Sequence, residues 1–317
     1  MFMAGWCKEH LSDEYEIVNV MANTGEEHAD TLRFADAGDR HFGLNLVWVE
    51  AVVHPGRTAC THRVVSYETA SRKGEPFEAV VAKYGLPNQT YKHCTRELKL
   101  NPINSYAESI GWEKGSYTTA IGLRTDELRR VSKNADTGNL IYPLIDMFPT
   151  DKEDVLTYFE AFPWDLRIEE FDGNCKTCFK KSDAKLLAVY RNTPESFDFP
   201  IRLDALYKDV GGNNIPGPRR MFRGFRSAPQ LVAQFQRSDF NPYRMFTDGG
   251  CSESCELFPM DEFPEVNSYS KVLDSDSKKP NGLQSEDCNP LISLENLAEW
   301  TGLEPATPGV TGPGLES

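Results

Sequence analysis

The stretch IVNVMANTG at residues 17–25 decides the fold class that we expect. Its apolar run ends in a turn-forming segment, which is typical of a buried strand that enters a turn. A helical pattern follows at residues 27–42 and ends at Gly43, and a second, valine-rich apolar run occupies residues 44–53. A strand, a helix and a strand at this spacing predict a βαβ unit. We therefore expect an α/β protein with a parallel sheet in its core.

Weaker patterns predict the elements around this unit. Further helices are expected at residues 1–12, 77–84 and 151–161, and another strand at residues 117–123. Thr150, followed by acidic residues, is the expected start of the helix at 151–161. The polar residues 54–75 predict a long loop.

Composition limits the classes of protein that fit. The chain has 317 residues, of which 39% are hydrophobic, and no run of eighteen apolar residues. We therefore expect no membrane span, and the absence of a basic leader favours a cytoplasmic protein. The net charge of −14 argues against a general nucleic-acid-binding surface, because phosphates are held by dense Lys and Arg.

Two of the eight cysteines form the close pair Cys175/Cys178, and two more form Cys251/Cys255. In a chain without an export signal, such pairs are more often metal or redox sites than structural disulfides. Thiolates three residues apart can both reach one metal ion or cluster. The spacing therefore predicts a metal or redox centre.

Several short motifs follow one another in a specific order. They are NTG at 23–25, KYGLP at 83–87, CTRELK at 94–99, AIGLR at 120–124, YPLID at 142–146 and GNCKTCF at 173–179. Together they make residues 1–195 resemble the phosphoadenosine phosphosulfate (PAPS) reductase family of adenine nucleotide α-hydrolase-like proteins. The GNCKTCF form is most similar to the branch carried by bacteriophages and mobile elements.

The resemblance implies a Rossmann-like nucleotide-binding fold and sulfur chemistry. The substrate would be ATP or PAPS, bound at the carboxyl ends of the strands, and a thiol could serve as electron donor. The implied nucleotide- or anion-binding residues are Thr24, Gly25, Glu27, Arg72, Arg124, Glu127 and Arg130. Simpler interpretations stay open. Thr24 could belong to an ordinary strand-to-helix turn, and Arg72 could lie in a solvated loop. The charge of Arg124 could be balanced by neighbouring carboxylates.

The resemblance also implies a metal centre. In the iron–sulfur branch of the family, a CysCys pair precedes a CxxC pair by about eighty residues. Here Cys94 precedes Cys175 by 81 residues, and His93 stands at the other position of the first pair. Cys94, Cys175 and Cys178 would hold a 4Fe–4S cluster, with His93, Cys251 or Cys255 as fourth ligand. Alternatively, the two CxxC-like pairs form a zinc site, or no metal is bound.

Two departures from the family widen the range of functions. The expected phosphate-binding loop would stand immediately before Met1, and the C-terminal GluCysGlyLeuHis segment of the reductases is absent. A DNA or transfer-RNA thiolation enzyme is therefore an alternative, and an inert nucleotide- or metal-binding protein is another. The thiolation alternative draws on the basic cluster of Arg219, Arg220, Arg223 and Arg226, although nucleic acid is not the favoured partner.

These patterns divide the chain into three parts. Residues 1–195 would form the PAPS reductase-like domain, and residues 196–261 an irregular extension that contains Cys and Arg. Residues 262–317 are rich in Pro, Ser and Asp, and we expect them to be largely disordered.

Overall fold

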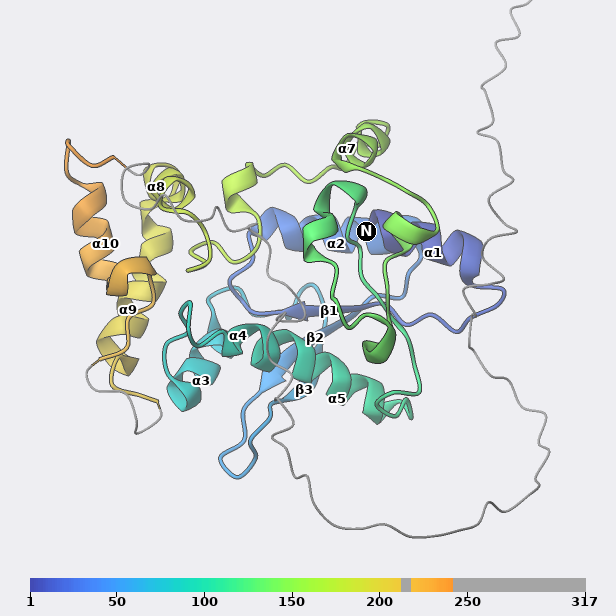
Figure 1. The fold of residues 1–317 in the computed structure, drawn as a ribbon, viewed down its shortest axis with the longest axis horizontal. Coiled ribbons are helices and arrows are strands. Elements are labelled where there is room, and N and C mark those ends of the chain that lie inside the picture. The colour runs from blue at the N-terminus through green and yellow to red at the C-terminus, as the bar shows by residue number, and fades with distance from the viewer. Residues whose placement is uncertain (212–217, 242–317) are drawn as a thin grey trace, which may run out of the picture. The chain divides into compact units, whose positions relative to one another are not determined.

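A computed structural model describes residues 1–211 and 218–241 of this chain. These residues lie within the compact unit Met1–Asn267 (Figure 1). The protein is α/β, with a three-stranded mixed sheet, a separate two-stranded parallel sheet, and helices around them. The predicted tail and the pair Cys251/Cys255 lie outside the described residues. No helix in the described part is long and apolar enough to cross a membrane.

The predicted βαβ unit is confirmed. Strand β1 (Val20–Asn23) pairs in parallel with β2 (Val47–Val52), and helix α2 (Ala29–Phe42) connects them. Gly43 ends α2 in the left-handed conformation, with φ of 60°, and its N–H donates to the Asp39 carbonyl. Glycine adopts this conformation without a Cβ clash, which is why the helix stops there.

The predicted loop at residues 54–75 contains a strand, so that part of the prediction is wrong. Strand β3 (Thr61–Val65) runs antiparallel to β2 and gives the sheet order β1-β2-β3. The side chains of β3 are half-buried or exposed. A strand with no buried face lacks the apolar alternation by which a sequence reveals it.

Helices cover both faces of this sheet. Trp48 of β2 packs with Leu32 and Ala35 of α2 on one face. Ala51 points to the other face, because side chains alternate along a strand, and joins the main core with Phe77 and Val80 of α3 (Glu75–Tyr84). Helix α5 (Asn101–Ser109) also contacts β2 and β3.

The remaining predicted elements are found with altered bounds. Helix α1 (Phe2–Leu11) matches, and α7 (Lys152–Glu160) begins after Asp151 rather than Thr150. The Asp151 carboxylate accepts the Asp154 N–H at 3.0 Å, so the aspartate is the cap. The strand expected at 117–123 is reduced to β4 (Thr119–Ala120), which pairs with β5 (Leu140–Ile141) in the second sheet.

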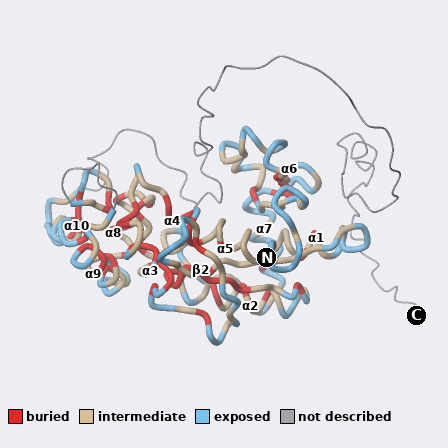
Figure 2. Tube along the Cα trace, turned by 90° about the horizontal axis from the view of Figure 1, so that it is seen from below, coloured by how far each residue is buried: buried red, intermediate tan, exposed pale blue. Residues whose placement is uncertain are grey.

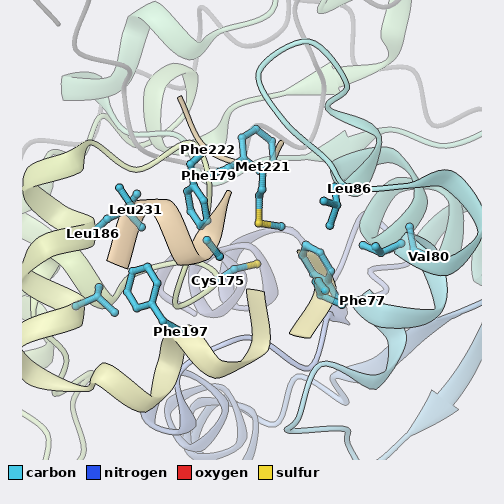
Figure 3. Packing of buried hydrophobic residues seen from close by; sticks show 14 of the residues in the cluster. Phe77, Val80, Leu86, Cys175, Phe179, Leu186, Phe197, Met221, Phe222 and Leu231 are labelled. Carbon is cyan, nitrogen blue, oxygen red and sulfur yellow. The ribbon is translucent and has the colours of Figure 1, made fainter. Parts of the chain in front are cut away.

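Helix α8 (Asp183–Asn192) and the two helices beyond residue 195 complete the main core. Helices α8, α9 (Asp198–Tyr207) and α10 (Ala228–Phe235) contribute fully buried side chains to it, among them Leu186, Leu203 and Leu231. Figure 3 shows this packing around Cys175. In Figure 2, segments coloured red for buried residues lie along the same helices. The described part of the predicted extension therefore shares one core with the residues before 195.

Candidate functional site

A pocket lies beside the carboxyl end of β1. Its empty volume is about 480 Å³, counted with its open mouth. The turn after β1 supplies Thr24 and Glu26, and the segment 94–99 supplies Cys94 and Lys99. The rest of the wall is mainly apolar or sulfur-bearing and consists of Phe77, Thr95, Leu98, Cys175, Thr177, Cys178, Phe179, Phe199 and Met221.

The turn after β1 is rigidly held. The Thr24 hydroxyl donates to the Glu27 carboxylate at 2.8 Å, and the Thr24 N–H donates to it at 3.0 Å. Lys99 Nζ lies 4.0 Å from the same carboxylate. The Glu27 carboxylate thus holds the turn together from inside. Thr24 stabilises this strand-to-helix turn, as its simpler interpretation described.

Gly25 allows this turn to approach the neighbouring chain closely. Its φ is 81°, and a Cβ at this position would lie 2.9 Å from the backbone nitrogen of Gly74. The Gly74 N–H donates to the Gly25 carbonyl at 2.9 Å. The glycine is therefore required by the backbone of the turn, whether or not a ligand approaches it.

We expect Gly25→Ala to lower the free energy of unfolding by at least about 1–2 kcal/mol, the cost of a left-handed L-residue. Gly56→Ala is the matched control, because nothing lies within 4 Å of a Cβ there. Urea denaturation of both variants measures the difference. Equal stability of the two variants would contradict the assigned close contact.

The cysteine-bearing loop is paired directly with this turn. Glu27 and Cys175 form an isolated antiparallel bridge, and the Lys176 N–H donates to the Glu26 carbonyl at 3.0 Å. The Thr24 hydroxyl oxygen lies 3.7 Å from the Cys175 sulfur. Segments separated by about 150 residues in the sequence thus form one wall of the pocket.

Glu26 is a site residue that the sequence analysis missed. It lines the pocket and is only 3% exposed. Burial raises the pKa of its carboxyl group to about 7, although the Lys176 ammonium group, 4.0 Å away, opposes this shift. A carboxyl group with such a pKa can donate or accept a proton near neutral pH. The pair Glu26–Glu27 carries no sequence signal for burial, because two adjacent glutamates usually indicate a surface.

All three cysteines of the predicted metal centre line the pocket, but they do not form a recognisable metal site. Cys175 and Cys178 come from the loop before α8, and Cys94 from α4 (His93–Thr95). In the described part of the chain, no three His, Cys, Asp or Glu side chains are arranged to hold a metal ion. The predicted metal centre therefore stays a prediction, and its possible ligands Cys251 and Cys255 lie outside the described residues.

His93, one proposed fourth ligand, is not among the residues that line the pocket. It is 8% exposed, and its Nε2 atom has no hydrogen-bond partner. Burial and the nearby Arg219 guanidinium lower the pKa of its imidazole to about 4. The ring is therefore neutral at physiological pH.

The segment that follows Cys94 has an unusual backbone. Residues Arg96–Leu100 form a π-helix (η1) between α4 and α5. Such turns are rare and frequently occur at functional sites. Here the π-helix carries Leu98 and Lys99, which both line the pocket.

Two cysteines outside the pocket are deeply buried. Burial raises the pKa of the Cys7 thiol to about 11, and burial together with Glu97 raises that of Cys60 to about 12. The thiolate is the reactive form of cysteine. We therefore expect both thiols to resist an alkylating reagent in the native protein at neutral pH and to react after unfolding. Mass spectrometry of the alkylated peptides checks this, and rapid native labelling of Cys60 would contradict its burial.

The predicted arginines are not among the residues that line this pocket. Arg124 follows β4 of the second sheet, and its guanidinium donates to both carboxylate oxygens of Asp126 at 2.9 and 3.0 Å. Glu127 forms ion pairs with Arg124 and Arg130. Arg72 donates to the carbonyls of Ala70 and Tyr67 within its own loop. None of these residues lines the pocket. Their partners lie within the same turn or loop, as the simpler interpretations of Arg72 and Arg124 described.

The basic cluster near residue 220 is also engaged within the protein. Arg219 donates to the Tyr84 carbonyl, Arg223 donates to the Lys180 carbonyl, and Arg226 forms a buried ion pair with Asp183 at 2.7 Å. Arg220 lies 4.0 Å from Asp204. These contacts hold helices together, so the structure adds no support to a nucleic-acid surface at this cluster.

The chain is similar to a protein of Escherichia phage lambda described as "Uncharacterized nin region protein ORF290". The two are 29% identical over 259 residues, which is 75% of this chain and 84% of that protein. No protein-family profile and no solved structure matches the chain. The likeness supports the expected association with bacteriophages, whereas the PAPS reductase resemblance stays a prediction.

Proposed function

We propose that this protein catalyses adenine-nucleotide-dependent sulfur chemistry at the pocket beside β1, on a fold of the adenine nucleotide α-hydrolase type. The observation that carries the proposal is that Cys94, Cys175 and Cys178 line the same pocket as Thr24. A sulfur-bearing wall beside a strand end is the arrangement that the resemblance implies. The reaction would be reductive cleavage of a sulfonucleotide, or adenylation of an acceptor followed by sulfur transfer.

The position and lining of the pocket support a nucleotide as the ligand. In open α/β sheets, ligands bind outside the carboxyl ends of the parallel strands, where Thr24 and Glu26 lie. Phe77 and Phe199, whose ring centroids are 5.7 Å apart, give the pocket an apolar wall, as ligand pockets commonly have. Glu26 supplies a carboxyl group that can exchange a proton near neutral pH.

No step of this proposal runs through a metal. The proposal rests on the thiols and the carboxyl group that line the pocket, and the metal centre stays a separate prediction.

The proposal is tested by calorimetric titration with ATP and with PAPS, followed by an assay for sulfite released from PAPS in the presence of a dithiol. We expect one nucleotide to bind and Cys175→Ser to abolish turnover. Cys7→Ser is the control, because Cys7 is buried in α1 and does not line the pocket. Binding of ATP without sulfite release would favour adenylation and sulfur transfer. Absence of binding by both nucleotides would contradict the proposal.

A further inference from the structure

Four aromatic side chains of α1, α7 and the segment after α6 (Pro143–Asp146) form a surface cluster, which we call the aromatic patch: Phe2, Trp6, Phe148 and Tyr158. Ring centroids are 4.8 Å apart for Phe2–Tyr158 and 5.7 Å apart for Trp6–Phe148. Phe148 remains 45% exposed and Tyr158 37% exposed. Figure 2 shows α7 as a mostly exposed helix. Contiguous exposed aromatic surface is typical of an interaction site.

Exposed carboxylates lie on the elements that carry the aromatic patch, and we call Glu9, Asp146 and Asp154 the acidic rim. The Asp154 carboxylate also accepts the Asp151 N–H at 2.9 Å. Glu9 follows Trp6 by three residues on α1, and Asp154 precedes Tyr158 by four on α7, so each lies on the same helix face as its aromatic neighbour. Burial raises the pKa of Tyr158, and the Glu9 carboxylate raises it further, which places this charge close to the patch.

Two nearby lysines have partners outside the aromatic patch. Lys8 donates to the Gly43 carbonyl, and Lys152 lies 4.0 Å from the Glu170 carboxylate. His10 stacks on Trp6 with ring centroids 4.7 Å apart. The Gly43 carbonyl does not neutralise Lys8, but the three rim carboxylates outnumber this lysine, so the net charge around the aromatic patch is negative.

Charge decides between the possible occupants of the patch. Residues 242–317 contain fourteen acidic and four basic side chains, so the acidic rim would repel this segment of the chain. A second copy that used the same patch symmetrically would bring two acidic rims together. The occupant that this surface fits is a different protein with positive charge.

We propose that the aromatic patch and acidic rim dock a basic amphipathic helix of a partner protein. Apolar side chains on one face of that helix would pack on the rings, and flanking Lys or Arg would pair with the rim carboxylates. Large aromatic anchors at the centre of an interface contribute most of the binding energy, while rim charges mainly set partner choice and association rate.

The test uses two synthetic helical peptides, one with Leu and Lys at amphipathic spacing and one with Glu in place of Lys. Anisotropy of the labelled peptides should show binding of the Lys peptide, weakened by salt, and no binding of the Glu peptide. Phe148→Ser combined with Tyr158→Ser should weaken binding at least about tenfold, as loss of anchor residues does. Glu9→Lys, an exposed change that preserves the fold, should weaken it independently.

Leu206→Ser is the matched control, because Leu206 is 59% exposed on α9 and outside the patch. It should bind the Lys peptide as the unaltered protein does. Equal binding of the Glu peptide, or equal weakening by Leu206→Ser, would overturn the proposal. A patch variant that instead dissociates a dimer in sedimentation would identify a second copy as the occupant and also overturn it.

Discussion

Replacing Glu50 with alanine should lower the free energy of unfolding by about 1–3 kcal/mol for each buried donor that is left without its acceptor. The carboxylate of Glu50 is fully buried in the centre of β2. It accepts hydrogen bonds from the Asn23 amide at 2.7 Å, the Ser71 N–H at 2.6 Å and the Arg63 guanidinium at 2.6 Å. The substitution leaves these donors without their acceptor and removes the side-chain link between β1, β3 and the loop at Ser71.

Urea denaturation at neutral pH measures this loss. Glu68→Ala is the control, because Glu68 lies on the exposed surface of the loop after β3 and its loss should change stability little. Equal stabilities of the two variants would show that the Glu50 network does not hold the sheet.

The same network predicts how stability depends on pH. Burial alone would raise the pKa of Glu50, but the hydrogen bonds from Ser71, Arg63 and Asn23 outweigh burial and hold it below its usual value. A carboxyl group with a lowered pKa stabilises the fold above its unfolded-state pKa, about 4.3, and loses this contribution as pH falls. The stability difference between the unaltered protein and Glu50→Gln should therefore shrink in acid. A constant difference from neutral pH to acid would contradict the assignment.

The second large effect concerns the helices after residue 195. Leu203 of α9 and Leu231 of α10 are completely buried in the main core, next to side chains from α3 and α8. Leu203→Ala and Leu231→Ala should each lower the free energy of unfolding by about 2–5 kcal/mol, because each leaves a cavity. Their unfolding should remain a single cooperative transition that includes the βαβ unit.

Leu206→Ala on the same helix is the control, because this side chain is 59% exposed. Chemical denaturation followed both by circular dichroism and by tryptophan fluorescence measures the transitions. An early, separate transition in the Leu231 variant would mean that α10 and the βαβ unit unfold independently, against the shared core described above.

Local patterns allowed the sequence to predict the central elements. All of these elements are found in the structure: the strands in the apolar runs around residues 17–22 and 44–53, the amphipathic helix between them, and its end at Gly43. Each is specified by residues a few positions apart in the chain. Strand β3 was missed because its pairing with β2, and not the burial of a face, holds it in the sheet. The helix at 152–160 was predicted, while its cap was assigned one residue too early.

The composition of the candidate site could be predicted only in part. The cysteine motifs and Thr24 stand out in the sequence, and the structure places them around one pocket. The arginines near residue 124 looked equally functional, but their partners are carboxylates within the same turn. Glu26 gave no signal, because its burial results from the pairing of its turn with the loop at Cys175, about 150 residues away.

The sequence by itself therefore determined the α/β class, the βαβ unit and the residue types available for sulfur chemistry. Only the tertiary structure decided which of these residues share a pocket, which charges are neutralised by a neighbour, and that α9 and α10 complete the main core. The physical reason is the range of the interactions. Helix periodicity, caps and turns depend on residues a few positions apart, whereas burial, pKa shifts and pocket walls arise from contacts between segments that are distant in the chain.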